Sequence, residues 1–180
     1  ARALERALPG VTVSTSNPDR VAYSRDLWPR RLLDVRAGRP AVSPPLAVVW
    51  PTSTDELATL TRFAHEEGCA LVPFGAGSGV CGAVDPSART IVVDLKKIRD
   101  FSIDPSGPQI DVGAGAMGIT LEEDLERAGF TIGHFPSSIL CSTVGGWIAA
   151  RGAGQCSGMY GKIEDMVVGL DVVLADGTLI

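Results

Sequence analysis

A glycine-rich stretch, residues 72–82 with the sequence VPFGAGSGVCG, constrains the fold of this chain most. Its glycines leave the main chain free to adopt positive φ and to turn several N–H groups toward one side. No large side chain would obstruct a diphosphate there, and the Ser78 hydroxyl adds a donor. The stretch therefore predicts a phosphate-binding loop, although tight turns and strand bulges also use glycine for steric reasons.

The spacing of Gly77, Gly79 and Gly82 fits the G-x-G-x-x-G pattern of dinucleotide-binding turns. That pattern requires a helix directly after the loop and an acidic residue about 20 positions further on. Here the loop is followed by Pro86 and then by a β-branched run, residues 90–95. Because this link leaves no room for a crossover helix, the Rossmann fold is excluded.

Composition excludes further classes. A chain of 180 residues that is 45% hydrophobic can bury a core as one domain or as two small lobes. Its 21 acidic and 16 basic residues argue against a nucleic-acid partner. Four cysteines without a CxxC pair, together with only two histidines, argue against a metal site. The sequence shows no secretory signal and contains no apolar run of about 20 residues. We therefore expect a cytoplasmic protein without a transmembrane segment.

Three regions are expected in chain order. Residues 1–45 are predicted to form an irregular N-terminal segment with one short helix, because prolines interrupt it repeatedly. Residues 46–104 are predicted to form a first lobe. In it, strands at residues 46–50 and 70–74 flank a helix that Ser53 and Glu56 would cap, and the glycine loop 73–82 follows.

Residues 105–180 are predicted to form the second lobe. A hairpin leads into it around the turn PSGP at residues 105–108. A helix at residues 120–128 and a strand at residues 130–135 would then complete a second βαβ-like passage. A last strand, residues 166–174, leads to a hairpin around an Asp-Gly turn.

A second loop, residues 134–143 with the sequence HFPSSILCST, is rich in hydroxyl groups. A short helix of small residues is predicted to follow at residues 144–151. Hydroxyls and free N–H groups at a helix start suit an anion, and Gly145 and Gly146 would let a flat ring system lie close to the backbone. Two such loops suit a long ligand that carries charge in its middle.

Together these motifs resemble the FAD-binding domain of the vanillyl-alcohol oxidase / p-cresol methylhydroxylase (PCMH-type) flavoprotein superfamily. Within it the chain resembles the D-lactate and glycolate dehydrogenase subunits and the alkyldihydroxyacetonephosphate synthases. The motifs that carry the resemblance are PFGAGSG at 73–79, PSS at 136–138, STVGGW at 142–147 and YGKIED at 160–165. The resemblance implies an α+β fold in which a small βαβ lobe packs against a second mixed sheet with helices, with FAD between them.

The resemblance also implies which residues contact FAD. The first loop would hold the diphosphate through its N–H groups, and the second loop would lie along the flavin and its ribityl or phosphate portion. The implied contacts are Phe74, Gly75, Ala76, Gly77, Ser78, Gly79, Pro136, Ser137, Ser138, Ser142, Thr143, Gly145, Gly146, Ala150, Gly152 and Ala153. Ser137 departs from the aspartate that often stands there in the synthase branch, so a hydroxyl replaces that carboxylate.

Non-covalent attachment of FAD is expected. Some family members link the flavin through a histidine in the first loop, which this chain lacks, or through a cysteine in the second. Cys141 stands where the cysteinyl-linked members have theirs, but we interpret it as a small, partly buried packing thiol. His134 is likewise interpreted as a structural histidine with satisfied hydrogen bonds, and Trp147 as a core residue. Of the neighbouring acids Glu164 and Asp165, one is expected to be solvated and the other to cap a helix.

The resemblance implies an FAD-linked oxidoreductase that oxidises a 2-hydroxy acid of the D-lactate or glycolate type by hydride transfer to flavin N5. Two alternatives stay open: a non-redox flavoenzyme similar to alkyldihydroxyacetonephosphate synthase, and a nucleotide-binding fragment without activity. The cap domain that supplies most substrate-binding and catalytic residues in the family has no counterpart here. We therefore expect an N-terminal fragment that is inactive alone and binds FAD weakly or not at all. Its substrate would be a small molecule bound through the absent cap domain, and a homodimer stays an open alternative.

Overall fold

The computed structural model describes residues 2–39 and 43–180.

Four strands form the sheet of the first lobe. The strands lie in the order β1 (Thr12–Ser14), β2 (Ala47–Trp50), β4 (Thr90–Asp94) and β3 (Ala70–Phe74). Strands β2, β4 and β3 are parallel, and β1 adds to the edge in antiparallel orientation. Every residue of β4 is buried, as expected for a central strand covered on both faces. The strands predicted in this lobe are confirmed.

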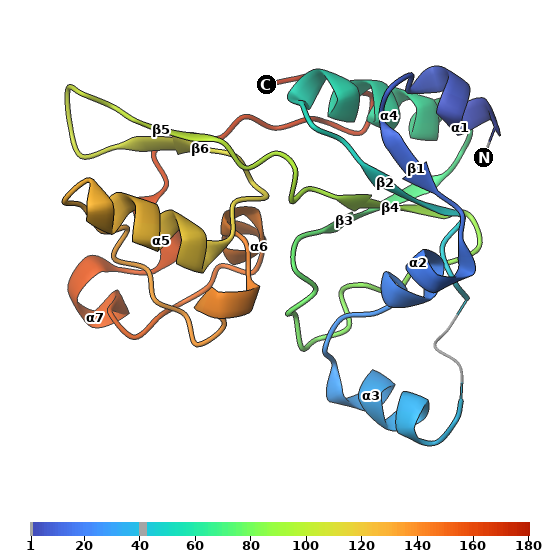
Figure 1. Cartoon of the computed structure of the whole chain (residues 1–180), viewed down its shortest axis with the longest axis horizontal. Helices are drawn as coiled ribbons and strands as arrows, with labels where there is room; N and C mark the ends of the chain where they lie inside the picture. The colour runs from blue at the N-terminus through green and yellow to red at the C-terminus, as the bar shows by residue number, and fades with distance from the viewer. Residues whose placement is uncertain (1, 40–42) are drawn as a thin grey trace.

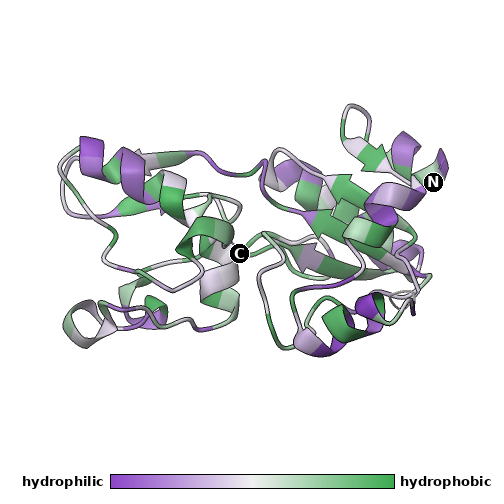
Figure 2. Cartoon of the chain, turned by 60° about the horizontal axis from the view of Figure 1, so that its bottom comes forward, coloured by the Kyte–Doolittle hydropathy of each residue, from purple (hydrophilic) through white to green (hydrophobic). Residues whose placement is uncertain are grey.

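Two helices cover one face of this sheet, α1 (Arg2–Ala7) and α4 (Thr54–Glu66) (Figure 1). The Ser53 hydroxyl caps α4 by accepting a hydrogen bond from the Glu56 N–H at 3.2 Å, which confirms the predicted start of this helix. The buried apolar residues beneath the two helices are Leu4, Leu8, Ala47, Val49, Leu60, Ile91 and Val93. In Figure 2 the strands are accordingly hydrophobic, and the outer helices carry the hydrophilic residues.

The short helix predicted in residues 1–45 is confirmed as α1, but the prediction that the rest of this segment is irregular is wrong. Besides α1 and β1 it contains α2 (Asn17–Ala22) and α3 (Pro29–Arg36). Each of these helices has a proline in its first turn, where no N–H is needed for the helix ladder, so the prolines begin helices here. Residues 1 and 40–42 of the predicted segment lie outside the described residues.

The second lobe begins with the predicted hairpin, β5 (Phe101–Ile103) and β6 (Ile110–Val112). Five short helical elements follow: α5 (Gly118–Arg127), the 3₁₀ helix η1 (Ile139–Cys141), α6 (Val144–Ala149), α7 (Ser157–Tyr160) and α8 (Ile163–Met166). A separate core supports them, made of Ala116, Leu121, Leu125, Val144, Trp147 and Ile163. The α+β class is confirmed, and Trp147 is a core residue as predicted.

The prediction of a mixed second sheet is wrong, because β5 and β6 form a two-stranded antiparallel sheet in the described part of the chain. Residues 130–135 are not a strand, so the second βαβ-like passage is absent there. Side chains and loops take the place of a neighbouring strand: the N–H of Ile132 donates to the Glu122 carboxylate, and the Phe135 carbonyl accepts from Gln155. An extended segment forms a sheet only where a second strand pairs with it.

The prediction of a strand at residues 166–174 is wrong over most of its length, because Met166 ends α8 and residues 167–171 form no strand; only the last residues pair. Val172 exchanges two backbone hydrogen bonds with Ile180, which confirms the predicted hairpin around Asp176 and Gly177. Gly177 supplies the positive φ, +83°, of that turn. Figure 1 shows that this C-terminal stretch crosses back from the second lobe to lie near α4 of the first.

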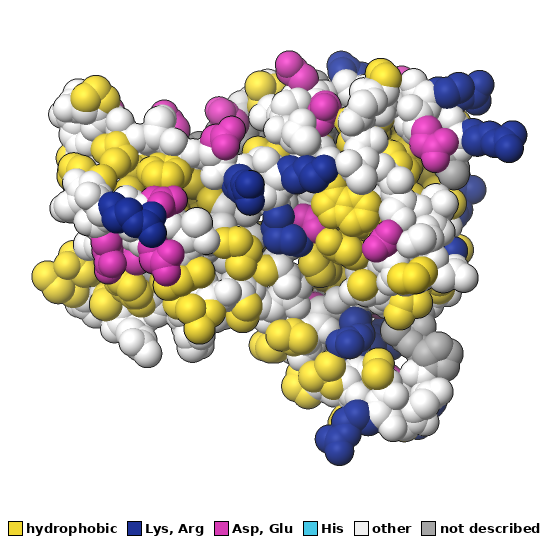
Figure 3. Space-filling view, viewed as in Figure 1, with side chains coloured by type: hydrophobic (Ala, Val, Ile, Leu, Met, Phe, Trp, Pro, Cys, Tyr) yellow, Lys and Arg dark blue, Asp and Glu magenta, His cyan; other side chains and the backbone are white. Residues whose placement is uncertain are grey.

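The lobes are joined by close backbone contacts where the chain leaves β6. Gly115 approaches the end of β4 so closely that an added Cβ would lie 1.8 Å from the carbonyl oxygen of Leu95. Its N–H donates to the carbonyl of Ile98 at 2.8 Å. The link that runs from β4 to β5 carries three basic residues, Lys96, Lys97 and Arg99. In Figure 3 basic side chains gather in the middle of the face, where Figure 1 draws this link.

The helices of residues 2–39 and 43–180 include none with the length and apolar character needed to cross a membrane.

Candidate functional site

The glycine loop leaves the end of β3 and requires glycine at two positions for conformation and space. Gly77 and Gly82 have positive φ values of +69° and +78°. An added Cβ would lie 2.5 Å from the Phe74 ring at Gly77, and 2.7 Å from the Trp28 ring at Gly82. The loop therefore folds tightly over two aromatic side chains.

A run of main-chain donors lies free along this loop. The N–H groups of residues 75–79 donate to no acceptor in the part of the chain that the structure describes. Ser78, in the middle of the run, adds a hydroxyl that likewise makes no hydrogen bond with the described residues. Successive unpartnered N–H groups on a glycine-rich turn form the concave donor surface that phosphate groups bind.

The hydroxyls of the second loop are used mainly within the protein. Ser142 accepts a hydrogen bond from the Trp147 indole at 2.6 Å and donates to the Ser138 carbonyl at 2.7 Å. The Thr143 hydroxyl caps α6 through the Gly146 N–H. Both side chains are buried, whereas Ser137 is exposed. The structure thus uses Ser142 and Thr143 to hold the second loop in place.

The two predicted loops meet in space although they are far apart in the sequence. An added Cβ on Gly75 would lie only 2.3 Å from the Thr143 hydroxyl oxygen. Gly145 also packs closely against Ala114, with 2.8 Å between an added Cβ and the Ala114 Cβ. Glycine at these positions therefore lets the loop, the start of α6 and the lobe junction approach each other. The contacts of the sixteen predicted residues with a cofactor remain a prediction.

The predicted contacts Ala150, Gly152 and Ala153 lie beyond the end of α6, around a residue with strained backbone. Arg151 has a positive φ of +51°, which is uncommon outside glycine. Its guanidinium binds the Glu164 carboxylate, with Nη2 3.1 Å from Oε1. Together with the Lys162 ammonium, 2.9 Å from the same oxygen, it lowers the pKa of Glu164 to about 2. Asp165 caps the start of α8, as predicted for one of the two acids.

His134 lies beneath this segment and is fully buried. Its ring packs edge-on against Trp147, with 4.9 Å between the ring centroids, and Nε2 faces Gly152. Neither ring nitrogen has a hydrogen-bond partner among residues 2–39 and 43–180. The prediction of a structural histidine with satisfied hydrogen bonds is therefore wrong about the bonds. Burial lowers the pKa of this imidazole below its ordinary value of 6.5.

We expect the free energy of unfolding to fall as the pH drops below about 6.5, because the unfolded chain then binds a proton that folded His134 rejects. Above that pH both states are neutral and the contribution is constant. Urea unfolding across this pH range measures the slope of the unfolding free energy against pH. It should vanish in His134→Phe and persist in a variant of the exposed His65, His65→Gln; the same slope in both variants would contradict the assignment.

A buried polar cluster supports the glycine loop from inside the first lobe. The Asp94 carboxylate, fully buried, accepts hydrogen bonds from Tyr23 at 2.5 Å, Trp50 at 3.1 Å and Lys96 at 2.6 Å. The Lys96 ammonium also donates to the carbonyl of Gly75 at 2.7 Å. Sequence reasoning missed this cluster; its one local signal is an aspartate that closes an apolar strand two residues before a lysine.

Within this cluster, burial and the hydrogen bond to Asp94 raise the pKa of Tyr23 to about 12. The chain has two tyrosines, so Tyr160→Phe leaves Tyr23 as the single phenol. We expect that phenol to ionise near 12 instead of 10 in an ultraviolet titration of the folded variant. Because the folded state favours the neutral phenol, stability should also decline above pH 10. Ionisation near 10 in the folded protein would show that the phenol is not bound to Asp94.

Asp26 holds the far end of the glycine loop. Its Oδ2 accepts hydrogen bonds from the N–H groups of Gly82 at 2.9 Å and Ala83 at 3.0 Å, and its Oδ1 accepts from Trp28 at 3.0 Å. The Leu27 N–H donates to the Gly79 carbonyl at 2.8 Å. The carboxylate is buried, and it belongs to the segment that the sequence had suggested to be irregular.

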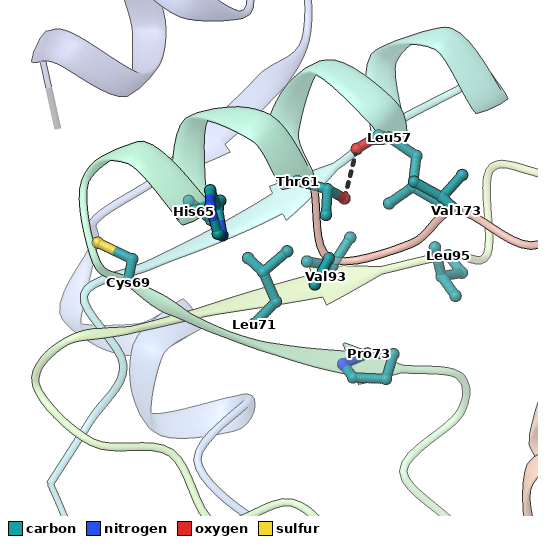
Figure 4. Close-up of a pocket in the computed structure, with 11 residues that line it drawn as sticks. Leu57, Thr61, His65, Cys69, Leu71, Pro73, Val93, Leu95 and Val173 are labelled. Atoms are coloured by element: carbon teal, nitrogen blue, oxygen red, sulfur yellow. Dashed lines mark hydrogen bonds between the residues drawn. The ribbon is translucent and has the colours of Figure 1, made fainter. Parts of the chain in front are cut away.

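A cavity of about 420 Å³ lies on the other side of the first lobe, between α4 and the sheet (Figure 4). Its walls are largely apolar, with Leu57, Leu71, Val93 and Val173 pointing inward. The hydroxyl of Thr61 is satisfied by the Leu57 carbonyl at 2.8 Å. None of the sixteen predicted contact residues lines this cavity, and it offers no row of donors for an anion.

Cys141 is exposed at the end of η1, so the prediction that it is partly buried is wrong. The 3₁₀ turn directs residues 140 and 141 outward, while Ser142 turns in to meet Trp147.

Comparison with known proteins gives consistent results. The sequence profile of a family described as FAD binding domain matches residues 45–180. The alkyldihydroxyacetonephosphate synthase of Trypanosoma brucei brucei is 37% identical over 161 residues, which are 86% of this chain and 25% of that protein. The glycolate oxidase subunit GlcD of Bacillus subtilis is 31% identical over 166 residues, 92% of this chain and 33% of that protein.

Among solved structures, an alkyldihydroxyacetonephosphate synthase superposes with a TM-score of 0.89 at 31% identity. The match covers 97% of this chain and 34% of that one. The chain thus spans a quarter to a third of the length of the relatives it matches.

Proposed function

Because this chain belongs to the FAD binding domain family of the PCMH type, we propose that it binds FAD non-covalently, with the diphosphate on the glycine loop. The observation that carries this proposal is the run of free N–H groups at residues 75–79 beside the start of α6. One glycine of positive φ, Gly77, lies within this run, and a second, Gly82, lies just beyond it.

The residues present fit this cofactor. Gly75 to Gly79 would bind the diphosphate, and the exposed Ser137 hydroxyl is free to bind a polar edge of the ligand. Ser142 and Thr143 would orient the second loop through the hydrogen bonds that they make within the protein. Bound FAD supplies the redox chemistry, and this part of the protein supplies its position.

For the complete enzyme we propose oxidation of a 2-hydroxy acid of the D-lactate or glycolate type, with hydride transfer to the flavin. The match to the glycolate oxidase subunit supports this activity, as does Ser137, which lacks the carboxylate common in the synthase branch. This chain covers 33% of that subunit, so the activity is proposed for the complete enzyme.

A second candidate is the non-redox chemistry of an alkyldihydroxyacetonephosphate synthase. It is favoured by the higher identity, 37%, and by the TM-score of 0.89. The two candidates share the FAD site and differ only in what the bound flavin does.

Cofactor binding is tested by titrating the complete product of the gene that encodes this chain with FAD and following flavin fluorescence. We expect saturable binding that Gly77→Val abolishes, because its side chain would strike the Phe74 ring, and that Gly107→Ala retains, because nothing lies within 4 Å of Gly107. Equal binding by both variants, or none by the wild type, would overturn the cofactor assignment.

The chemistry is tested on the complete product of the gene that encodes this chain, loaded with FAD under anaerobic conditions. Bleaching of the flavin by D-lactate or glycolate supports the oxidase proposal. A bound flavin that neither acid bleaches, together with formation of an alkyldihydroxyacetonephosphate, supports the synthase candidate instead.

A further inference from the structure

The ammonium of Lys96 lies directly beneath the glycine loop. It is 2.7 Å from the carbonyl oxygen of Gly75 and 2.6 Å from Oδ2 of Asp94. The rings of Phe74 and Tyr23 lie beside it, with centroids 5.1 Å and 5.6 Å from Nζ. Asp94 is fully buried, so the lysine neutralises a carboxylate that has no access to water. Charge neutralisation alone, however, would not require the bond to Gly75.

The bond to Gly75 determines the direction of a main-chain donor. In a trans peptide the carbonyl and the following N–H point in opposite directions. Since the Gly75 carbonyl points toward Lys96, the N–H of Ala76 points away from the lobe interior. That N–H is one of the free donors of the loop.

The far end of the loop is oriented in the same way. The Gly79 carbonyl accepts from Leu27, so the N–H of the next residue, Val80, is turned away from α2 and its following turn. Asp26 anchors the residues just beyond. These two attachment points fix the directions of the N–H groups of Ala76 and Val80 before any ligand arrives. Donors fixed in advance bind more tightly, because binding costs less conformational entropy.

We propose that Lys96 is a positioning residue for the FAD diphosphate, acting through the Gly75–Ala76 peptide. This inference rests on the proposed function of the loop. Lys96 does not contact the ligand; it fixes the N–H of Ala76 in the orientation that a phosphate oxygen requires.

The test compares Lys96→Met with Lys97→Met, the adjacent lysine, which is exposed and bonds only the Thr12 hydroxyl. FAD affinity is measured by fluorescence titration of the complete gene product, and loop order is measured without FAD by backbone ¹⁵N relaxation. We expect Lys96→Met to bind FAD about 10- to 100-fold more weakly, the usual effect of losing a hydrogen bond to a charged group. The order parameters at residues 75–79 should fall from about 0.85 toward 0.6 in Lys96→Met only.

Lys96→Met leaves Asp94 buried without its partner, so a double variant, Asp94→Asn with Lys96→Met, removes both charges together. If Lys96→Met fails to fold, the double variant carries the same expectations. Loosening confined to the loop supports positioning, whereas a merely structural role would loosen β3 and β4 as well.

Three outcomes separate this inference from the proposed function. Wild-type binding with equal affinity in folded Lys96→Met, or in the double variant, overturns the inference and leaves the proposed function standing. Absence of FAD binding in both wild type and Lys97→Met overturns the proposed function. If no FAD binds, the order parameters still test Lys96. Unchanged order parameters at residues 75–79 in Lys96→Met overturn the inference too, whereas a fall confined to the loop supports the conclusion that Lys96 orients it.

Discussion

Gly115→Ala is expected to lower the free energy of unfolding by about 3 kcal/mol or more, because an added Cβ overlaps its neighbours more closely here than at any other glycine of the chain. The added Cβ would lie 1.8 Å from the Leu95 carbonyl oxygen and 2.4 Å from the Leu95 carbonyl carbon. Both atoms belong to the backbone at the end of β4, so no side-chain rotation relieves the overlap. Either the lobe junction opens or the end of the central strand moves.

The matched control is Gly107→Ala, in the hairpin turn of the same lobe, where an added Cβ meets nothing within 4 Å. It should change stability by no more than about 0.5 kcal/mol. Urea unfolding monitored by tryptophan fluorescence measures both variants. Equal midpoints would mean that Gly115 does not approach Leu95 as described.

The second large effect is expected from Asp26→Ala, which removes the acceptor of three backbone N–H groups, those of Trp28, Gly82 and Ala83. Leaving buried donors without partners costs about 1–3 kcal/mol for each group that water does not reach, so we expect a loss of about 3 kcal/mol in unfolding free energy. FAD binding should weaken as well, because the far end of the loop loses its anchor.

Asp26→Asn retains one acceptor oxygen and should have an intermediate effect. Asp85→Asn is the control, since Asp85 is an exposed partner of Arg31 at 2.8 Å and surface ion pairs contribute at most about 1 kcal/mol. Thermal unfolding and FAD titration of the four proteins rank them. An Asp26→Ala variant as stable as Asp85→Asn would show that the carboxylate does not hold the loop.

The first lobe could be predicted from sequence because its signals are local. The apolar runs that became β2, β3 and β4 are bounded by turn residues, and Ser53 marks the start of α4. The glycine loop could be recognised for the same reason, since its conformation is encoded in the glycines themselves.

The supports of the loop could not be predicted, because they depend on contacts between distant residues. Asp26 reaches Gly82 across 56 positions, and Tyr23 reaches Asp94 across 71. The composition of residues 1–45 suggested only an irregular, solvated segment. A proline that begins a helix cannot be told from a proline that interrupts one by residue type alone. In the second lobe the strand prediction at residues 130–135 was wrong because an extended segment needs a partner that local patterns do not identify.

The strand order of the first lobe has a consequence for the order of events during synthesis. Strand β4 lies between β2 and β3 although it is made after both, so neither earlier strand can find its parallel neighbour until residue 94 has left the ribosome. At roughly 5–20 residues per second, β3 waits about 1 to 4 seconds for the 20 residues that separate Phe74 from Asp94. The glycine loop waits with it, because Lys96 emerges only after β4. The proposed diphosphate loop is therefore completed late in translation of this lobe, after its central strand has been made.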